Sequence, residues 1–233
     1  MERQFEIQID KLKTRLIKMC SLVDEQVELA IKSIDEENME LADLVIERDA
    51  KVDKYDVKIE KICQKIFALS QPVAMDLRLI MSALTINTNL ERIGDLAVNI
   101  SESAKEMGKK PDFYEKTHLK EMAQVTREMI KNAIDAFIEG SPDLAKKVIE
   151  TDDKVDDFNV ENHFILKGIM KEKPENVDPG IALLVVSRHL ERLADHATNI
   201  AEDVFFIVEA QMVKHKYEKI VFGDEDSDES SDD

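Results

Sequence analysis

A repeated set of acidic residues is the part of this sequence best suited to chemistry. The segment from 89 to 102 returns one hundred residues later as 189 to 202. The polar positions shared by the two copies are Glu91, Asp95, Asn99 and Glu102 in the first, and Glu191, Asp195, Asn199 and Glu202 in the second. A helix core does not require these polar side chains, so their retention after duplication indicates retained chemistry.

A second repeated pair of acids precedes each of these segments. Asp49 and Asp53 return as Asp152 and Asp156, in matching apolar surroundings. Residues four apart project from one face of a helix, one turn from each other, so each pair could chelate a hard cation. In so acidic a chain this spacing also arises by chance, and the alternative for any single pair is a solvated face.

The height of the pairs along a helical hairpin makes the metal interpretation more specific. The Asp49 and Asp53 pair lies about nineteen residues before the turn at Ser70, and Glu91 with Asp95 lies about twenty-two after it, so a rise of 1.5 Å per residue brings them level. The same coincidence occurs in the second half.

Four carboxylates held together without a cation would raise one another's pKa values, so each cluster favours a metal ion or a basic partner. Oxygen ligands favour magnesium, manganese, calcium or iron over zinc.

The helical wheel places these acids outside the core. Glu91, Asp95 and Glu102 point about 140° to 180° from the apolar seam of their helix, which predicts open sites on the surface. We interpret Asn99, Glu102, Asn199 and Glu202 as candidate supplementary ligands, with helix solubility as the equal alternative. No nucleophile and base arrangement is present in the sequence, so no catalytic residue is predicted.

Apolar periodicity predicts the elements that position these acids. Apolar residues recur at steps of three and four from Phe5 onward, which is typical of long helices. Asn38 is predicted to cap the second helix, and Ser141 with Pro142 to begin the fifth. The six predicted helices run from about 5 to 34, 39 to 69, 75 to 107, 113 to 139, 142 to 171 and 179 to 215.

The predicted fold is therefore all-α, with two tandem pseudo-symmetric three-helix bundles. The expected domains are residues 1–109 and 110–220, followed by a disordered acidic tail at 221–233. Six glycines, five prolines and no tryptophan among 233 residues agree with long helices.

Charge and apolar content exclude several classes of function. A formal net charge of −18 opposes the binding of nucleic acid, which requires a basic face. Cys20 and Cys63 lie among apolar residues and form no CxxC, so they are predicted to be reduced core thiols. No apolar run reaches the length of a spanning helix and the start of the chain lacks a signal-peptide pattern, which predicts a cytoplasmic protein.

These motifs resemble the PhoU family of regulators of phosphate transport. The resemblance covers residues 1 to about 215. It rests on the repeated acidic pairs named above, on the segments 91–100 and 191–200 that contain them, and on Met75-Asp76-Leu77-Arg78 at the start of the third helix.

The resemblance implies a non-catalytic regulator that carries multinuclear metal clusters, most of all iron, with manganese, magnesium and zinc as other candidates. It also implies a homodimer at the inner face of the membrane, between a phosphate ABC transporter and a sensor histidine kinase, which damps the phosphate-starvation response when phosphate is plentiful. The acidic tail departs from the family pattern.

Two other classes of function stay open at this point. A carboxylate-bridged metal oxidase or metal store would also use helical Glu and Asp ligands, but it normally requires paired Glu-x-x-His segments. Glu115-x-x-His118 is the nearest match, and it lies away from the acidic pairs. A metal-free adaptor whose acidic faces dock basic partners is the third hypothesis.

Overall fold

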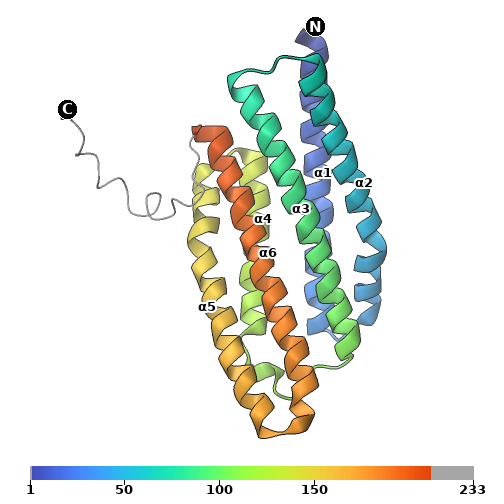
Figure 1. Cartoon of the computed structure of the whole chain (residues 1–233), viewed down its shortest axis with the longest axis vertical. Coiled ribbons are helices and arrows are strands. Elements are labelled where there is room, and N and C mark those ends of the chain that lie inside the picture. Colours follow the sequence, from blue (N-terminus) through green and yellow to red (C-terminus); the bar gives the residue numbers. More distant parts are fainter. Residues whose placement is uncertain (1, 211–233) are drawn as a thin grey trace, which may run out of the picture.

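The computed structural model describes residues 2–210, which form six long helices arranged as two three-helix bundles side by side (Figure 1). The helices are α1 Glu2–Asp35, α2 Met39–Leu69, α3 Ala74–Met107, α4 Leu119–Glu139, α5 Pro142–Glu172 and α6 Val177–Glu209. Helices α1 to α3 pack together, as do α4 to α6, and the bundles join where α3 packs against α6 and α1 against α4. The predicted all-α fold of two tandem bundles is confirmed.

Local signals in the sequence set most of the helix ends. The side chain of Asn38 accepts a hydrogen bond from the Glu40 amide, and Ser141 accepts one from the Leu144 amide ahead of Pro142. Both predicted caps are therefore confirmed. Gly108 and Gly140 follow α3 and α4 with φ values of 68° and 64°, a conformation that glycine adopts without steric cost.

Two predicted helix starts were wrong. The fourth helix begins at Leu119 instead of near residue 113, because residues 114–116 form a separate 3₁₀ turn, η1 Tyr114–Lys116. Its Tyr114 is buried, and the hydroxyl lies 3.3 Å from Asp35 Oδ1 at the end of α1. This contact ties the connection to the first bundle.

Helix α6 begins at Val177, because the first turn of a helix tolerates Pro179. It follows a second 3₁₀ turn, η2 Pro174–Asn176.

The C-terminal expectations lie partly outside the described residues. Helix α6 ends at Glu209, and Ala210 follows with a positive φ of 57°. The predicted helix end at His215 and the acidic tail at 221–233 both lie beyond residue 210. The connection between α3 and α4 spans residues 108–118. The domain limits predicted there, 1–109 and 110–220, stay predictions.

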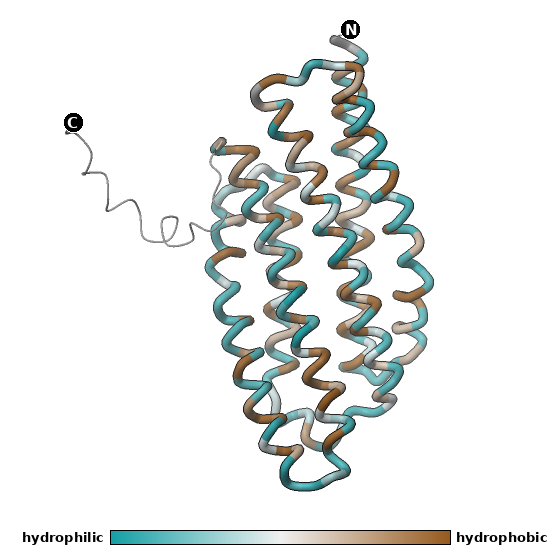
Figure 2. The backbone as a smooth tube through the Cα atoms, viewed as in Figure 1, coloured by the Kyte–Doolittle hydropathy of each residue, from teal (hydrophilic) through white to brown (hydrophobic). Residues whose placement is uncertain are grey.

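Each bundle buries the apolar seam of its helices, together with a few polar side chains such as Gln26, Asn87 and Asn162. Hydrophilic and hydrophobic residues alternate along every helix (Figure 2). Cys20 and Cys63 are buried free thiols, and burial raises their pKa values to about 12 and about 11. Such thiols are unreactive, as expected of core residues. Among residues 2–210, no helix is both long and apolar enough to cross a membrane.

Candidate metal centres

The first carboxylate cluster, defined as Asp49, Asp53, Glu91 and Asp95, lies between α2 and α3. Burial raises the pKa of Asp49, and the charges of Asp53 and Asp95 raise it further. Burial also raises the pKa of Glu91, with contributions from Asp95 and Asp53. The four carboxylates thus influence one another's ionisation, and their grouping as one metal site stays a prediction.

The second carboxylate cluster, defined as Asp152, Asp156, Glu191 and Asp195, lies at the equivalent place between α5 and α6. Burial, followed by the charges of Asp156 and Asp195, raises the pKa of Asp152 to about 7. Burial and the charge of Asp195 also raise the pKa values of Asp156 and Glu191. The second cluster is thus partly protonated at neutral pH in the absence of a cation.

A hydrogen bond between neighbouring helices sets the register of each cluster. In the first bundle, the Asn87 side chain on α3 donates to Oδ1 of Asp56 on α2 at 2.5 Å. In the second, the Ser187 hydroxyl on α6 donates to Oδ1 of Asn159 on α5 at 2.9 Å. The residues differ between the bundles, but they occupy matching positions of the repeat. Sequence reasoning missed these bonds because the residue type differs at both equivalent positions: Asp56 corresponds to Asn159, and Asn87 to Ser187.

Gln26 and Gly94 support the first cluster and were not identified from the sequence. Gln26 extends from α1, is almost fully buried and donates to the Val45 carbonyl at 3.4 Å. Hydrogen bonding from Gln26 partly offsets the raised pKa of Asp49. A Cβ built on Gly94 would lie 3.4 Å from both Asp49 Oδ1 and Val52 Cγ1. A polar Gln within an apolar stripe was the signal that could have revealed this support.

Different residues surround the second cluster. Met129 and Ala194 occupy the positions equivalent to Gln26 and Gly94, and Thr198 replaces Val98. Thr198 partly opposes the raised pKa of Asp152, but among residues 2–210 its buried hydroxyl makes no hydrogen bond. The second cluster therefore lacks an equivalent of the buried Gln26 amide that α1 supplies to the first.

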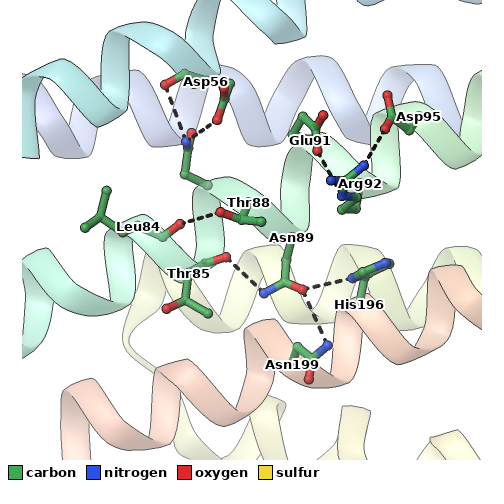
Figure 3. Close-up of polar contacts among 11 residues, drawn as sticks. Asp56, Leu84, Thr85, Thr88, Asn89, Glu91, Arg92, Asp95, His196 and Asn199 are labelled. Atoms are coloured by element: carbon green, nitrogen blue, oxygen red, sulfur yellow. Dashed lines mark hydrogen bonds and ion pairs between the residues drawn. The ribbon is translucent and has the colours of Figure 1, made fainter.

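Arginine side chains neutralise part of each cluster. Arg92 lies 3.4 Å from Glu91 Oε2 and 3.1 Å from Asp95 Oδ2 (Figure 3). In the second cluster Arg188 contacts Glu191 at 2.5 Å. Both arginines are exposed, at 57% and 61% of their side-chain surface. Exposed pairs of this kind contribute little stability, so they leave most of the repulsion between the acids in place.

The acids of the two clusters differ in their exposure to solvent. The side chain of Glu91 is 25% exposed and that of Asp95 is 39% exposed, but Glu191 is only 12% exposed. A wheel describes one helix alone and leaves out the packing of α6 against its neighbouring helices. Asp53, Asp156 and Asp195 are exposed, so each cluster is open to solvent at these aspartates and enclosed at its glutamate.

The residues present fit a hard cation, although they do not enclose one. Within residues 2–210, no three Asp, Glu, His or Cys side chains converge closely enough to hold an ion. In the same range, Asp152 Oδ1 and Glu191 Oε2 are buried oxygens without a hydrogen-bond partner. Unpaired buried oxygens with raised pKa values are the donors that a divalent cation would satisfy by drawing the carboxylates together. Their role as metal ligands stays a prediction.

The predicted supplementary residues fall into different environments. Asn199 donates to Asn89 Oδ1 across the interface of the bundles at 3.4 Å, and it is therefore engaged away from the carboxylates (Figure 3). Glu102 is exposed, whereas Asn99 and Glu202 are partly buried. A supplementary role for these four residues stays a prediction.

A polar contact joins α3 to α6 at the interface of the two bundles. The Asn89 amide donates to the Thr85 carbonyl at 2.9 Å, so its Oδ1 accepts. His196 Nδ1 lies 2.9 Å from that oxygen and must carry the proton (Figure 3). Burial lowers the pKa of His196, with a smaller lowering by Arg192 and Arg92, against the opposing effect of Asp195. His196 is a neutral donor in an interface, and not a catalytic base.

Comparison with known sequences identifies one family. A family model described as the PhoU domain matches residues 16–104 and again residues 119–204. The phosphate-specific transport system accessory protein PhoU homolog of Aquifex aeolicus is 38% identical over 212 residues, covering 91% of this chain and 96% of that protein. The accessory protein PhoU of Serratia marcescens is 33% identical over 215 residues, covering 91% of this chain and 87% of that protein.

Solved structures agree with the sequence matches. The crystal structure of PhoU from Pseudomonas aeruginosa superposes with a TM-score of 0.85 at 31% identity, covering 89% of this chain and 100% of that one. The phosphate transport system regulatory protein PhoU from Streptococcus pneumoniae gives a TM-score of 0.81 at 25% identity, covering 90% of this chain and 99% of that one.

Proposed function

The chain belongs to the PhoU family, and from this premise we propose that it is an accessory regulator of phosphate transport that acts as a metal-binding adaptor. Its relatives are named as accessory proteins of a phosphate-specific transport system. The observation that carries the proposal is the pair of carboxylate clusters at matching positions of the repeat, each with raised carboxyl pKa values. Retained acidic residues with raised pKa values indicate a binding role for both bundles.

The proposed adaptor acts in the cytoplasm, at the inner face of the membrane. It would connect a phosphate ABC transporter with a sensor histidine kinase and reduce the starvation response when phosphate is plentiful. We further propose that it forms a homodimer and that each carboxylate cluster holds iron or another hard cation. A cation would supply positive charge to the four acids and satisfy the buried oxygens of Asp152 and Glu191.

The structure offers little support to the oxidase alternative. Within the described residues, His118 of the Glu115-x-x-His118 segment pairs with Glu161 and stacks on Phe158. Neither partner belongs to a carboxylate cluster. Oxygen consumption on addition of ferrous iron to the metal-free protein would nevertheless restore this alternative.

Deletion of the gene tests the regulatory proposal. We expect phosphate-responsive genes to be expressed in phosphate-rich medium, because the damping component is missing. A plasmid copy should restore repression, and a copy with Asp95→Ala and Asp195→Ala should not. Glu139→Ala, at an exposed position at the end of α4, is the matched control and should restore repression fully. Unchanged expression in the deletion strain would refute the proposal.

A further inference from the structure

Exposed apolar side chains recur at equivalent positions of the two halves. Leu77 and Val177 are 36% and 37% exposed, and Met81 and Ile181 are 49% and 50% exposed. These residues lie near the starts of α3 and α6, one hundred residues apart in each case. The core does not require them, because their side chains face outward. Matching exposure in both halves indicates a shared use on the surface.

These side chains share a face with the carboxylate clusters. At about 100° per residue, Leu77, Met81 and Asp95 lie within roughly 40° of one another on α3, and the equivalent residues do so on α6. Helices α3 and α6 pack side by side and run in opposite directions (Figure 1). We call the joint surface the α3–α6 face. It carries two apolar ends, which are Leu77 with Met81 near the start of α3 and Val177 with Ile181 near the start of α6. Both clusters lie between these ends.

The two apolar ends lie far apart along this face. Asn89 on α3 is level with His196 on α6, so Met81 and Ile181 are separated by about 35 Å at 1.5 Å per residue. Figure 2 shows apolar segments at the start of each helix, at opposite ends of the bundle pair. At the Ile181 end, a groove of about 450 Å³ lies between α3 and α6, with Glu106 and Asp178 on its lining. An apolar side chain from a partner would fit this groove.

The charge of the face limits what can cover it. The eight clustered acids, with Glu102 and Glu106 on this side of α3, outnumber the two arginines that pair with cluster acids, Arg92 and Arg188. The whole chain carries a formal charge of −18. A second copy would bring two acidic faces together, so the proposed homodimer would use another surface. An anionic membrane is disfavoured for the same reason. The occupant must therefore be a protein with basic residues between two apolar contacts.

Symmetry specifies the partner further. The α3–α6 face presents the same apolar contact twice, in opposite directions, and each repeat supplies one copy. A surface with two equivalent, oppositely directed contacts matches a partner that is itself two-fold symmetric. We propose that one α3–α6 face binds a homodimeric protein across its two-fold axis, so that each partner subunit contacts one apolar end and the basic centre covers the clusters.

A binding experiment with a homodimer of the phosphate transport system tests this proposal. The probe is the ATP-binding subunit pair of the phosphate transporter from the same cell, and its choice rests on the proposed function. Native mass spectrometry of the full chain with this pair should show one chain for every two ATP-binding subunits. Met81→Glu and Ile181→Glu should each weaken binding at least tenfold, because each buries a charge against an apolar contact.

Phe164→Glu provides the matched control. Phe164 is 67% exposed on α5, away from the α3–α6 face, and its equivalent in the first half is Lys61. Its replacement should leave binding unchanged, and circular dichroism should show that all three variants keep the helical fold. A ratio of one to one, weakening by only one of the two variants, or no complex would overturn the inference. If deletion still derepresses phosphate-responsive genes, such a result refutes the inference alone and leaves the proposed function standing.

Discussion

The two carboxylate clusters have the same arrangement of acids but different surroundings, and this difference separates ligand from environment. In the first, the buried amide of Gln26 and the absence of a side chain at Gly94 keep polar atoms beside Asp49. In the second, an apolar Met129 and a methyl group at Ala194 occupy those positions, and the pKa of Asp152 rises to about 7. Duplication kept the acids and allowed their supports to diverge, so the second cluster should respond to pH near neutrality.

The largest expected effect is on metal affinity. Because a metal ligand must lose its proton, the second cluster should bind divalent cations about tenfold or more weakly at pH 6 than at pH 8. Asp95→Ala isolates the second cluster and Asp195→Ala isolates the first. Isothermal titration of manganese into each variant at both pH values measures the difference. An equal pH dependence in the two variants would remove the proposed distinction.

Asp152→Asn should stabilise the metal-free protein. The pKa of Asp152 is raised from 3.8 to about 7 on folding, so the folded state binds the proton more tightly than the unfolded state. Stability therefore falls as pH rises from about 4 to about 7 and stays low above that range. Allowing for partial exposure and coupling, removal of the charge should add about 1–2 kcal/mol at pH 8.

Urea unfolding at pH 8 and pH 5 tests the Asp152→Asn prediction, with Glu139→Ala as the control. The gain should be largest at pH 8 and should shrink at pH 5, where the wild-type carboxyl is already protonated. A loss of stability at pH 8 would show that Asp152 is ionised in a favourable environment even without metal.

Exchanging the supports should make the first cluster resemble the second. Gln26→Met removes the hydrogen bonding that lowers the pKa of Asp49 and should raise that pKa. We also expect a loss of about 1 kcal/mol in the stability of the metal-free protein at pH 8, the usual value of a buried hydrogen bond. Carboxyl titration followed by NMR measures the pKa, and Met129→Gln is the reciprocal variant. No change at Asp49 would mean that Gln26 serves only the packing of α1 against α2.

Gly94→Ala should have the smallest effect. The added Cβ would make ordinary contacts at 3.4 Å with Asp49 and Val52, and the equivalent residue in the second bundle is already Ala194. Replacing a helical glycine by alanine should therefore stabilise the protein, by about 0.5 kcal/mol after allowance for the close contacts. Thermal unfolding measures this gain. A clear loss of stability would show that α2 and α3 cannot move apart by the small distance required.

The fold was predictable because its signals are local. Apolar periodicity gave the helices, and Asn38, Ser141 and Pro142 gave two of their starts. The predicted start of α4 was wrong because a tertiary contact between Tyr114 and Asp35 decides where the chain enters the helix. Periodicity of one segment carries no information about such a contact.

The acids of the candidate site could also be found from the sequence, since repeat spacing and helix rise brought them level. Their surroundings could not. Gln26 reaches the first cluster from α1, a helix that contributes no acid to it, and Glu191 is only 12% exposed once α6 packs against its neighbours. The bond of Asn199 to Asn89 depends on how α6 packs against α3. Packing between elements determines all three features.

Metal analysis of protein purified without an affinity tag tests the central claim most directly. We predict that wild-type protein from cells contains iron or another divalent metal, that Asp95→Ala and Asp195→Ala each lose the share held by one cluster, and that the double variant loses nearly all of it while remaining folded. A wild-type protein without bound metal, which also takes up none when supplied with ferrous iron or manganese, would contradict the assignment of the two clusters as metal centres.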